Sequence, residues 1–487
     1  MLVLPEGSSI KLYIKSKTMK RMNFNIKRAF AVVLMLVAVL GASAQALRTG
    51  YFLDGNLFRY RLNPALSGER GYFSLPVLGG INVNSMGNFG LSNFLYESPT
   101  NANELVTFMH SSVSADEFLG NLESDNLMNM NLDFTLLSMG FKAFGGYNTI
   151  DLTLRSQTGM SLPYDMFRFM KVMGDANYSF GDINMRTRNF ADLSLGHSHK
   201  IGESLTVGAR AKFLFGLAYA DVKFDQMDLS MNSNRWEIAA RGEANIAMGG
   251  AFTYSDEKTA SGKTVVGGYD DIKAGLQGFG MGLDLGATYD FSELLTPGLV
   301  VSASLTDLGY IKWNKAARAA IAPEDSYTFE GFSQMGIHSD SKNAPIEDQW
   351  ETTRDELEDF FALEDKGEGS VSSGLGAKLN LGVEYSMPFY NKLSAGLLYT
   401  HCFDDVYSYN QTSLMVSISP VSVLDFAVSG TFSDYGTGFG AMANLHCTGF
   451  SFFVGTDCFI GKVGKQFIPL ENMNASVSFG VNIAFGK

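Results

Sequence analysis

Long runs in which apolar and polar residues alternate are the feature that most constrains this chain. The last run puts five apolar residues on one face, namely Val477, Phe479, Val481, Ile483 and Phe485. Similar runs occur within residues 205–217, 279–289 and 375–385. Because successive side chains of a strand point to opposite sides, each run predicts a strand with one apolar and one polar face. Faces of this length exceed those of the usual soluble strand. They are typical of a barrel wall between lipid and a polar lumen.

The connections between these runs predict the number of strands. Membrane barrels alternate short turns at one end with long loops at the other. We delimit fourteen strands, with a short turn after each even-numbered strand, the first of them at Met139-Gly140. This parity requires residues 218–276 to be one excursion with its own hairpin around Trp236. The sequence therefore predicts an all-β fold, a transmembrane antiparallel β-barrel of about 14 strands within residues 72–487. Twelve or sixteen strands stay open.

Four long external loops follow from the same division, at residues 85–127, 157–188, 218–276 and 309–372. The last is strongly acidic, with fourteen Asp/Glu against three Lys/Arg between residues 323 and 370. Within it, Trp350, Leu357, Phe360 and Phe361 have nearly helical spacing, which indicates a short amphipathic helix. The loop is either a solvated charged segment or a lid or docking surface.

The N-terminus has the layout of an export signal. A basic stretch from Met19 to Arg28 precedes twelve apolar residues, and Ala42-Ser43-Ala44 supplies the small residues of a cleavage site. The apolar stretch is too short to span a bilayer. We expect residues 1–44 to be a signal peptide cut before Gln45, with residues 1–18 an upstream extension.

Charge and cysteine content exclude several functions. Residues 1–44 hold seven Lys/Arg and one Glu, so the remaining chain has 30 basic and 49 acidic residues, a net charge near −19. Nucleic-acid binding needs a basic face and is not expected. The cysteines Cys402, Cys447 and Cys458 have no metal-binding or redox spacing.

Catalytic motifs are missing from the sequence. There is no G-x-S-x-G and no H-E-x-x-H. His197 and His199 share a strand face, but no third ligand lies near them in sequence. We therefore expect no enzyme activity, no catalytic residues, no metal and no cofactor.

Charged residues recur on the polar faces of the strands. Isolated buried charges cost several kcal/mol each, so these residues must pair or meet water. They indicate either a hydrated, plugged lumen or pairs that brace the wall. The predicted lumen-facing charges are Asp151, Arg155, Asp192, Arg210, Lys212, Asp284, Lys378 and Glu384.

Three segments carry a family resemblance. Asn63-Pro64-Ala65-Leu66 resembles the plug motif of FadL-type channels for hydrophobic compounds and their relatives, which include type IX secretion barrels. Residues 305–313 and 379–385 resemble an uncharacterised outer-membrane family of the same group. The resemblance implies fourteen strands and an N-terminal hatch over residues 45–71, with Asn63, Pro64 and Ala65 as plug residues.

The leading functional hypothesis is a porin-like channel in the outer membrane of a Gram-negative bacterium. It would take up a small, hydrophobic molecule passively, with both termini in the periplasm. Its other partners would be outer-membrane lipid and the barrel insertion machinery, which reads a C-terminal aromatic residue such as Phe485. One alternative is a structural or secretion-associated barrel whose external loops dock a protein partner. A lipid-modifying enzyme is the third.

Overall fold

The computed structural model describes residues 47–487 except 67, 69, 77, 91–92, 102–103, 173, 175, 233–234, 255–261, 263, 265, 274, 322–325, 332–345, 459–473 and 486–487. The predicted signal peptide and its cleavage site lie outside the described residues. The contacts of the chain separate residues 1–41 from residues 42–487, and the described residues all belong to the second unit.

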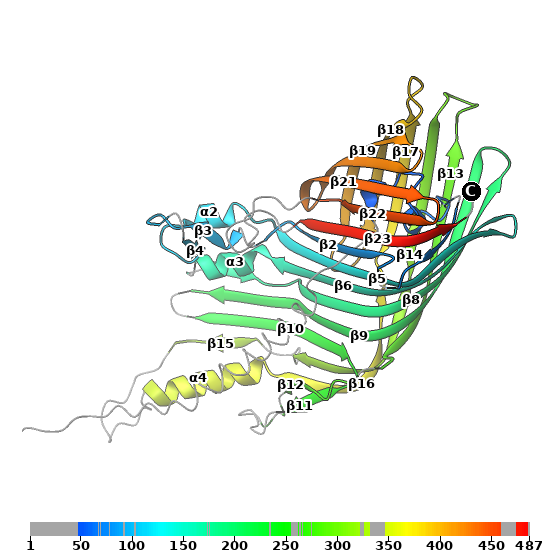
Figure 1. Ribbon diagram of the computed structural model, residues 1–487. Coiled ribbons are helices and arrows are strands. Elements are labelled where there is room, and N and C mark those ends of the chain that lie inside the picture. Colours follow the sequence, from blue (N-terminus) through cyan, green and yellow to red (C-terminus); the bar gives the residue numbers. More distant parts are fainter. Residues whose placement is uncertain are drawn as a thin grey trace, which may run out of the picture. The chain divides into compact units, whose positions relative to one another are not determined.

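Fourteen antiparallel strand positions form one closed wall, as predicted (Figure 1). Each position pairs with the next along the chain, and β23 closes the ring by pairing with β22, β1 and β2. The wall strands are β1 (Gly71–Ser74) with β2 (Ile81–Gly87), β5 (Asp125–Ala143), β6 (Gly146–Pro163), β8 (Ile183–Ile201), β9 (Leu205–Met231), β13 (Gly278–Asp290), β14 (Leu299–Ile321), β17 (Ala377–Ser386), β18 (Leu393–Phe403), β19 (Tyr409–Val421), β20 (Leu424–Ser433), β21 (Gly436–Cys447), β22 (Phe450–Thr456) and β23 (Ala475–Phe485).

The two ends of the barrel differ in their connections. One end carries the turns at residues 144–145, 202–204, 422–423 and 448–449 and is called the short-turn end. The opposite end, the long-loop end, carries the connections 88–124 and 164–182, among others.

Alternation along the strands sorts residues between the two faces of the wall. On β19, Gln411, Ser413 and Ser417 are buried inside, whereas Leu414 and Val416 are exposed on the outside. A closed ring leaves no strand edge unpaired, so every backbone polar group of the wall can bond within it. The outer face of β19 is therefore apolar, while its backbone pairs with β18 on one side and β20 on the other.

The predicted turn at Met139-Gly140 is wrong. Both residues lie inside β5, and the turn to β6 is Phe144-Gly145, whose φ angles of 57° and 76° suit a tight hairpin. Gly140 has a packing role instead, because a Cβ atom there would lie 2.2 Å from the Tyr147 hydroxyl.

Several strands also continue into segments predicted as loops. β6 runs to Pro163, β8 begins at Ile183, β9 reaches Met231 and β14 reaches Ile321. Beyond the apolar band the outer face of a strand no longer needs apolar residues, so the alternation that defines a strand in the sequence fades there.

Additional strands extend the wall at the long-loop end. β10 (Trp236–Ala247) forms the hairpin with β9 expected around Trp236, and it also pairs with β14 and with β15 (Tyr327–Phe329). β16 (Leu363–Gly374) pairs with β14 and leads through a bend into β17. A separate hairpin joins β11 (Ala251–Tyr254) to β12 (Val266–Asp270).

The connections 88–124 and 164–182 form a small folded unit, which we call the loop cap. It contains β3 (Leu95–Glu97), β4 (Leu105–Thr107), α2 (Ala115–Leu119), α3 (Tyr164–Lys171) and β7 (Ala176–Ser179). An aromatic core that includes Phe94, Phe108, Phe118 and Phe167 holds it together. The amphipathic helix expected near Trp350 is α4 (Ile346–Phe360). In the part of the chain that the structure describes, no helix has the length and apolar character needed to cross a membrane.

If the outer face of the wall contacts lipid, a charge on the outer face of β19 should destabilise the barrel by an amount that depends on its depth. Leu414 and Val421 are similarly exposed on the outer face, at 57% and 50%, but Leu414 lies in mid-strand and Val421 at the short-turn end. Arginine at mid-membrane costs about 2–4 kcal/mol and near the interface about 0–1 kcal/mol. We expect Leu414→Arg to lower the free energy of unfolding in lipid vesicles by the larger amount and Val421→Arg by the smaller. Equal losses from urea titrations of both variants would contradict a membrane-embedded outer face.

Candidate functional site

Residues 47–66, the N-terminal segment, are packed against the inner side of the wall. Two short helices, η1 (Arg48–Gly50) and η2 (Arg59–Arg61), fold the segment compactly. Its apolar side chains form clusters with inward residues of the wall such as Met415, Ala427 and Met442.

The start of the segment bonds to strands β19 and β20 and to the residues after β22. Asp457 accepts hydrogen bonds from the backbone N–H groups of Arg48, at 2.9 Å, and Thr49, at 2.7 Å. The Arg48 guanidinium donates to Gln411 Oε1 at 2.7 Å and to the Tyr409 hydroxyl.

The second half of the segment bonds to β5 and β6, on another side of the barrel. The Tyr60 hydroxyl donates to Asp151 Oδ1 at 2.7 Å, and Arg61 donates to the same oxygen at 3.0 Å. Burial raises the pKa of Tyr60 and the Asp151 charge raises it further, so the hydroxyl keeps the proton that it donates. The N-terminal segment is therefore bonded to wall strands well separated around the ring.

Asn63, Pro64 and Ala65 lie in the middle of these contacts. Asn63 is fully buried, and its amide nitrogen donates to the Tyr51 hydroxyl at 3.1 Å while its oxygen accepts from Ala65 N at 3.0 Å. Glycines of the wall make room for them. A Cβ atom at Gly286 would lie 2.0 Å from Asn63 Oδ1, and one at Gly208 would lie 2.4 Å from the Pro64 carbonyl.

A network of buried ion pairs lies beside the segment. Five cations, Arg61, Arg155, Arg210, Lys212 and Lys378, pair with five carboxylates, Asp133, Asp151, Asp192, Asp284 and Asp307. The opposite charges balance, as buried charges require to offset the loss of hydration. A cavity of about 70 Å³ lies among these side chains, and polar cavities of this kind can hold water.

Asp307 is the centre of the network. Arg155 holds its carboxylate with two hydrogen bonds of 2.7 and 2.9 Å, and Lys212 and Lys378 add contacts of 2.6 and 3.1 Å. Its φ of 57° lies in the left-handed region, which few residues other than glycine, asparagine and aspartate adopt. The backbone N–H of Asp307 donates to Asp284 Oδ1 at 2.7 Å, which stabilises this conformation.

The structure brings seven of the eight predicted lumen charges into the network and leaves Glu384 outside it. Glu384 lies on β17 near Asp54 and Arg59 of the N-terminal segment instead. Sequence reasoning missed Arg61, Asp133 and Asp307. Asp307 lies within residues 305–313, one of the segments that carry the family resemblance. The alternation of polar and apolar residues breaks there, and this break is the signal in the sequence that marks Asp307.

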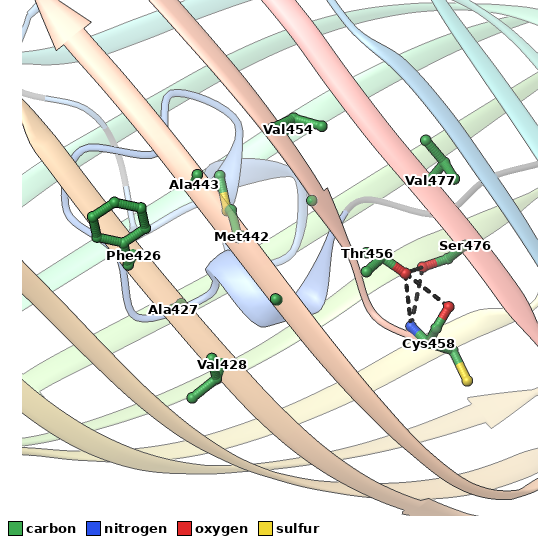
Figure 2. Close-up of a pocket in the computed structure, with 12 residues that line it drawn as sticks. Phe426, Ala427, Val428, Met442, Ala443, Val454, Thr456, Cys458, Ser476 and Val477 are labelled. Atoms are coloured by element: carbon green, nitrogen blue, oxygen red, sulfur yellow. Dashed lines mark hydrogen bonds between the residues drawn. The ribbon is translucent and has the colours of Figure 1, made fainter. Parts of the chain in front are cut away.

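A second hollow lies on the outer face of the wall (Figure 2). It has a volume of about 610 Å³ and is lined largely by apolar side chains of β20, β21 and β22, such as Phe426, Val428 and Val454. The small residues Ala441 and Ala443 leave it open. The N-terminal segment lies on the other side of this wall (Figure 2). A Cβ atom at Gly50 of the segment would lie 2.5 Å from Met442 Sδ. This hollow is thus separate from the polar interior.

Other candidate residues form no further site. The rings of His197 and His199 are 5.9 Å apart, and His197 contacts Asn148. Within the described ranges, no group of three or more His, Cys, Asp and Glu residues is arranged to hold a metal ion. The three cysteines, all described, form no disulfide.

The chain has low sequence identity to proteins of known structure, but it matches one protein family. No curated protein matches the sequence. Among solved structures, the chain is similar to a FadL homologue of Pseudomonas aeruginosa, at 10% identity over 91% of this chain and 99% of that one, with a TM-score of 0.39. It is also similar to the toluene transporters TodX of Pseudomonas putida (10% identity, 91% and 94% of the two chains, TM-score 0.36) and TbuX of Ralstonia pickettii (9%, 88% and 92%, TM-score 0.37). The chain belongs to the family of unknown function DUF5723, which matches residues 64–457.

Proposed function

We propose that this protein is an outer-membrane β-barrel of a Gram-negative bacterium that acts as a passive channel for a small molecule. In this proposal the N-terminal segment, residues 47–66, is the plug that closes the lumen. The predicted export signal and the apolar outer face of a closed barrel support the location. The short-turn end and both termini would face the periplasm.

The observation that carries the proposal is the two-sided attachment of the segment. Asp457 holds one part of it, and Asp151 on β6 holds another. Asn63, Pro64 and Ala65 would anchor the plug, because they occupy the space beside Gly208 and Gly286 of the wall. A side chain at either glycine would overlap with them. The hydrogen bonds to Asp457 and Asp151 can be exchanged for hydrogen bonds to water when the plug moves.

A small hydrophobic molecule remains the substrate that the plug-motif resemblance predicts. The ion-pair network bears on that prediction, because a charged layer interrupts any continuous apolar path through the lumen. Solutes that form hydrogen bonds with a polar wall are not hindered by the charged layer in this way. The second candidate function is a barrel whose external loops dock a protein partner. The loop cap favours this function, because its aromatic core gives these loops a folded structure that a set of loose loops would lack.

Deleting residues 47–66 tests the plug directly. We expect the deleted protein to assemble as a heat-resistant barrel and to conduct several-fold more ions in planar bilayers than the full chain, because the space that the segment fills would become water. Deleting α4 (Ile346–Phe360), which lies in a connection at the long-loop end, is the matched control and should leave the conductance unchanged. A folded barrel without the segment but with unchanged conductance would remove the basis for a channel and favour docking.

A further inference from the structure

Inward-facing residues of four neighbouring strands stand in rows near the long-loop end. The rows follow from the register, since directly paired residues of adjacent antiparallel strands lie side by side on one face. Across β2, β5, β6 and β8 they are Met86–Asn129–Gly159–Arg186, then Asn84–Asn131–Gln157–Arg188, then Asn82–Asp133–Arg155–Phe190. Asp133 and Arg155 of the third row belong to the ion-pair network. The middle row holds three uncharged amide side chains, Asn84, Asn131 and Gln157, which we call the amide row.

The amide row has buried oxygens with no donor. Asn84 Oδ1, Asn131 Oδ1 and Gln157 Oε1 make no hydrogen bond within the protein, although their side chains belong to residues only 2–3% exposed. The nitrogens of two of them are used, Asn131 Nδ2 by Asn129 Oδ1 and Gln157 Nε2 by the Leu375 carbonyl at 3.5 Å. A buried acceptor left without a donor costs about 1–3 kcal/mol, so three in one row indicate a donor from outside the chain, either water or a hydroxyl group of a solute.

A turn from across the barrel covers this region. Residues 404–408 join β18 to β19, and Tyr407 is buried against Gly159, where a Cβ atom would lie 2.0 Å from its ring. Arg188, the last residue of the middle row, donates to Asp404 Oδ2 at 2.7 Å and to the Tyr407 hydroxyl at 2.9 Å. Arg186 in the row above pairs with Asp405. The turn is thus attached to both rows by charged hydrogen bonds.

The chemistry of these groups favours an uncharged ligand. No carboxylate belongs to the amide row. The charge next to it, Arg188 beside Gln157, is already paired with Asp404, and Asp133 and Arg155 of the next row pair with each other at 3.4 Å. An ion would lose its hydration there without a partner charge, whereas a hydroxyl group loses little when it donates to an amide oxygen. The Tyr407 ring adds an apolar face with a polar edge.

We propose that the amide row is a binding site for a small, uncharged, hydroxyl-rich solute, and that the turn 404–408 covers it. The proposal rests on the channel function, since the site lies inside the lumen. It names a hydroxyl-rich solute in place of the hydrophobic molecule that the plug-motif resemblance predicts. The turn must move for the solute to enter, because Tyr407 fills the space above Gly159.

Binding can be measured without transport, by the thermal unfolding of the full chain in detergent with increasing glucose. Sugars stabilise proteins in general through exclusion from the surface, so the decisive quantity is the difference between variants. Gln157→Met and Asn131→Leu keep the side-chain shape and remove the amide, and Gln226→Met on β9 makes the same change outside the row. We expect a saturable rise of the midpoint for the wild type and Gln226→Met, as a specific ligand gives. The two row variants should show only the weak linear rise.

Equal responses of all four proteins would overturn the site. A saturable rise with ammonium chloride in place of glucose would overturn the uncharged class of ligand. If one row variant fails to fold, the other decides, because the two substitutions lie on different strands. A saturable glucose response, together with unchanged conductance after deletion of residues 47–66, would leave the site standing and remove the channel.

Discussion

Replacing Asp307 with asparagine is expected to destabilise the barrel by about 3–5 kcal/mol, the usual cost of removing one partner from a buried ion pair. Arg155, Lys212 and Lys378 all contact this carboxylate. Asparagine keeps the size of the side chain and tolerates the left-handed φ of 57°, so the loss reports on charge rather than on backbone strain. Urea unfolding in vesicles, followed by the heat-dependent mobility of the barrel on gels, measures it.

An ion pair whose carboxylate is exposed provides the control for this prediction. Asp54 pairs with Arg59 at 2.7 Å, but its side chain is 92% exposed. Exposed pairs contribute about 0–1 kcal/mol, so Asp54→Asn should lower the free energy of unfolding by no more than that. Similar losses for the two variants would show that the Asp307 network is screened by water and does not hold the wall together.

The closed wall was predictable because its physical cause is repeated in every strand. In residues 477–485 and in the other wall strands, the apolar face lies on the outside of the barrel and the polar face lies toward the lumen. Each strand therefore shows the alternating pattern by itself. The turn after β5 was not predictable in the same way. Gly140 and Gly145 are both plausible turn residues, and only the packing of Tyr147 against Gly140 separates them.

The ion-pair partners within the lumen cannot be predicted from the sequence of any single strand. Alternation identifies Lys212 and Lys378 as inward residues, but their shared partner Asp307 follows from the stagger of β9, β14 and β17 around the ring. Arg61 joins the network from the N-terminal segment, where no strand pattern marks it. The amide row had a visible signal, since Asn82 and Asn84, like Asn129 and Asn131, repeat at a spacing of two. Their alignment into one row required the register.

The position of the N-terminal segment can be tested through a single wall glycine. A Cβ atom at Gly286 would lie 2.0 Å from Asn63 Oδ1 and 2.9 Å from Pro64 Cδ. Leucine at this position cannot coexist with the observed path of the segment. Overpacking of this kind costs about 1–3 kcal/mol when the neighbours stay in place. The local hydrogen bonds of Asn63 are weaker than the strand pairing of the wall, so we expect the segment to be displaced and the barrel to persist.

Trypsin reports this displacement directly, because the segment contains Arg48, Arg59 and Arg61 and trypsin cuts after arginine. Arg48 is 2% exposed in the packed segment. We expect Gly286→Leu to make the segment at least tenfold more susceptible to cleavage in detergent, with the barrel itself intact, and to raise the conductance in planar bilayers. Gly430→Leu on β20 is the matched control, since a Cβ atom there meets nothing within 4 Å. If both variants resist trypsin as the wild type does, the segment does not depend on the space at Gly286. Asn63 and Pro64 would then have no anchoring role at that wall.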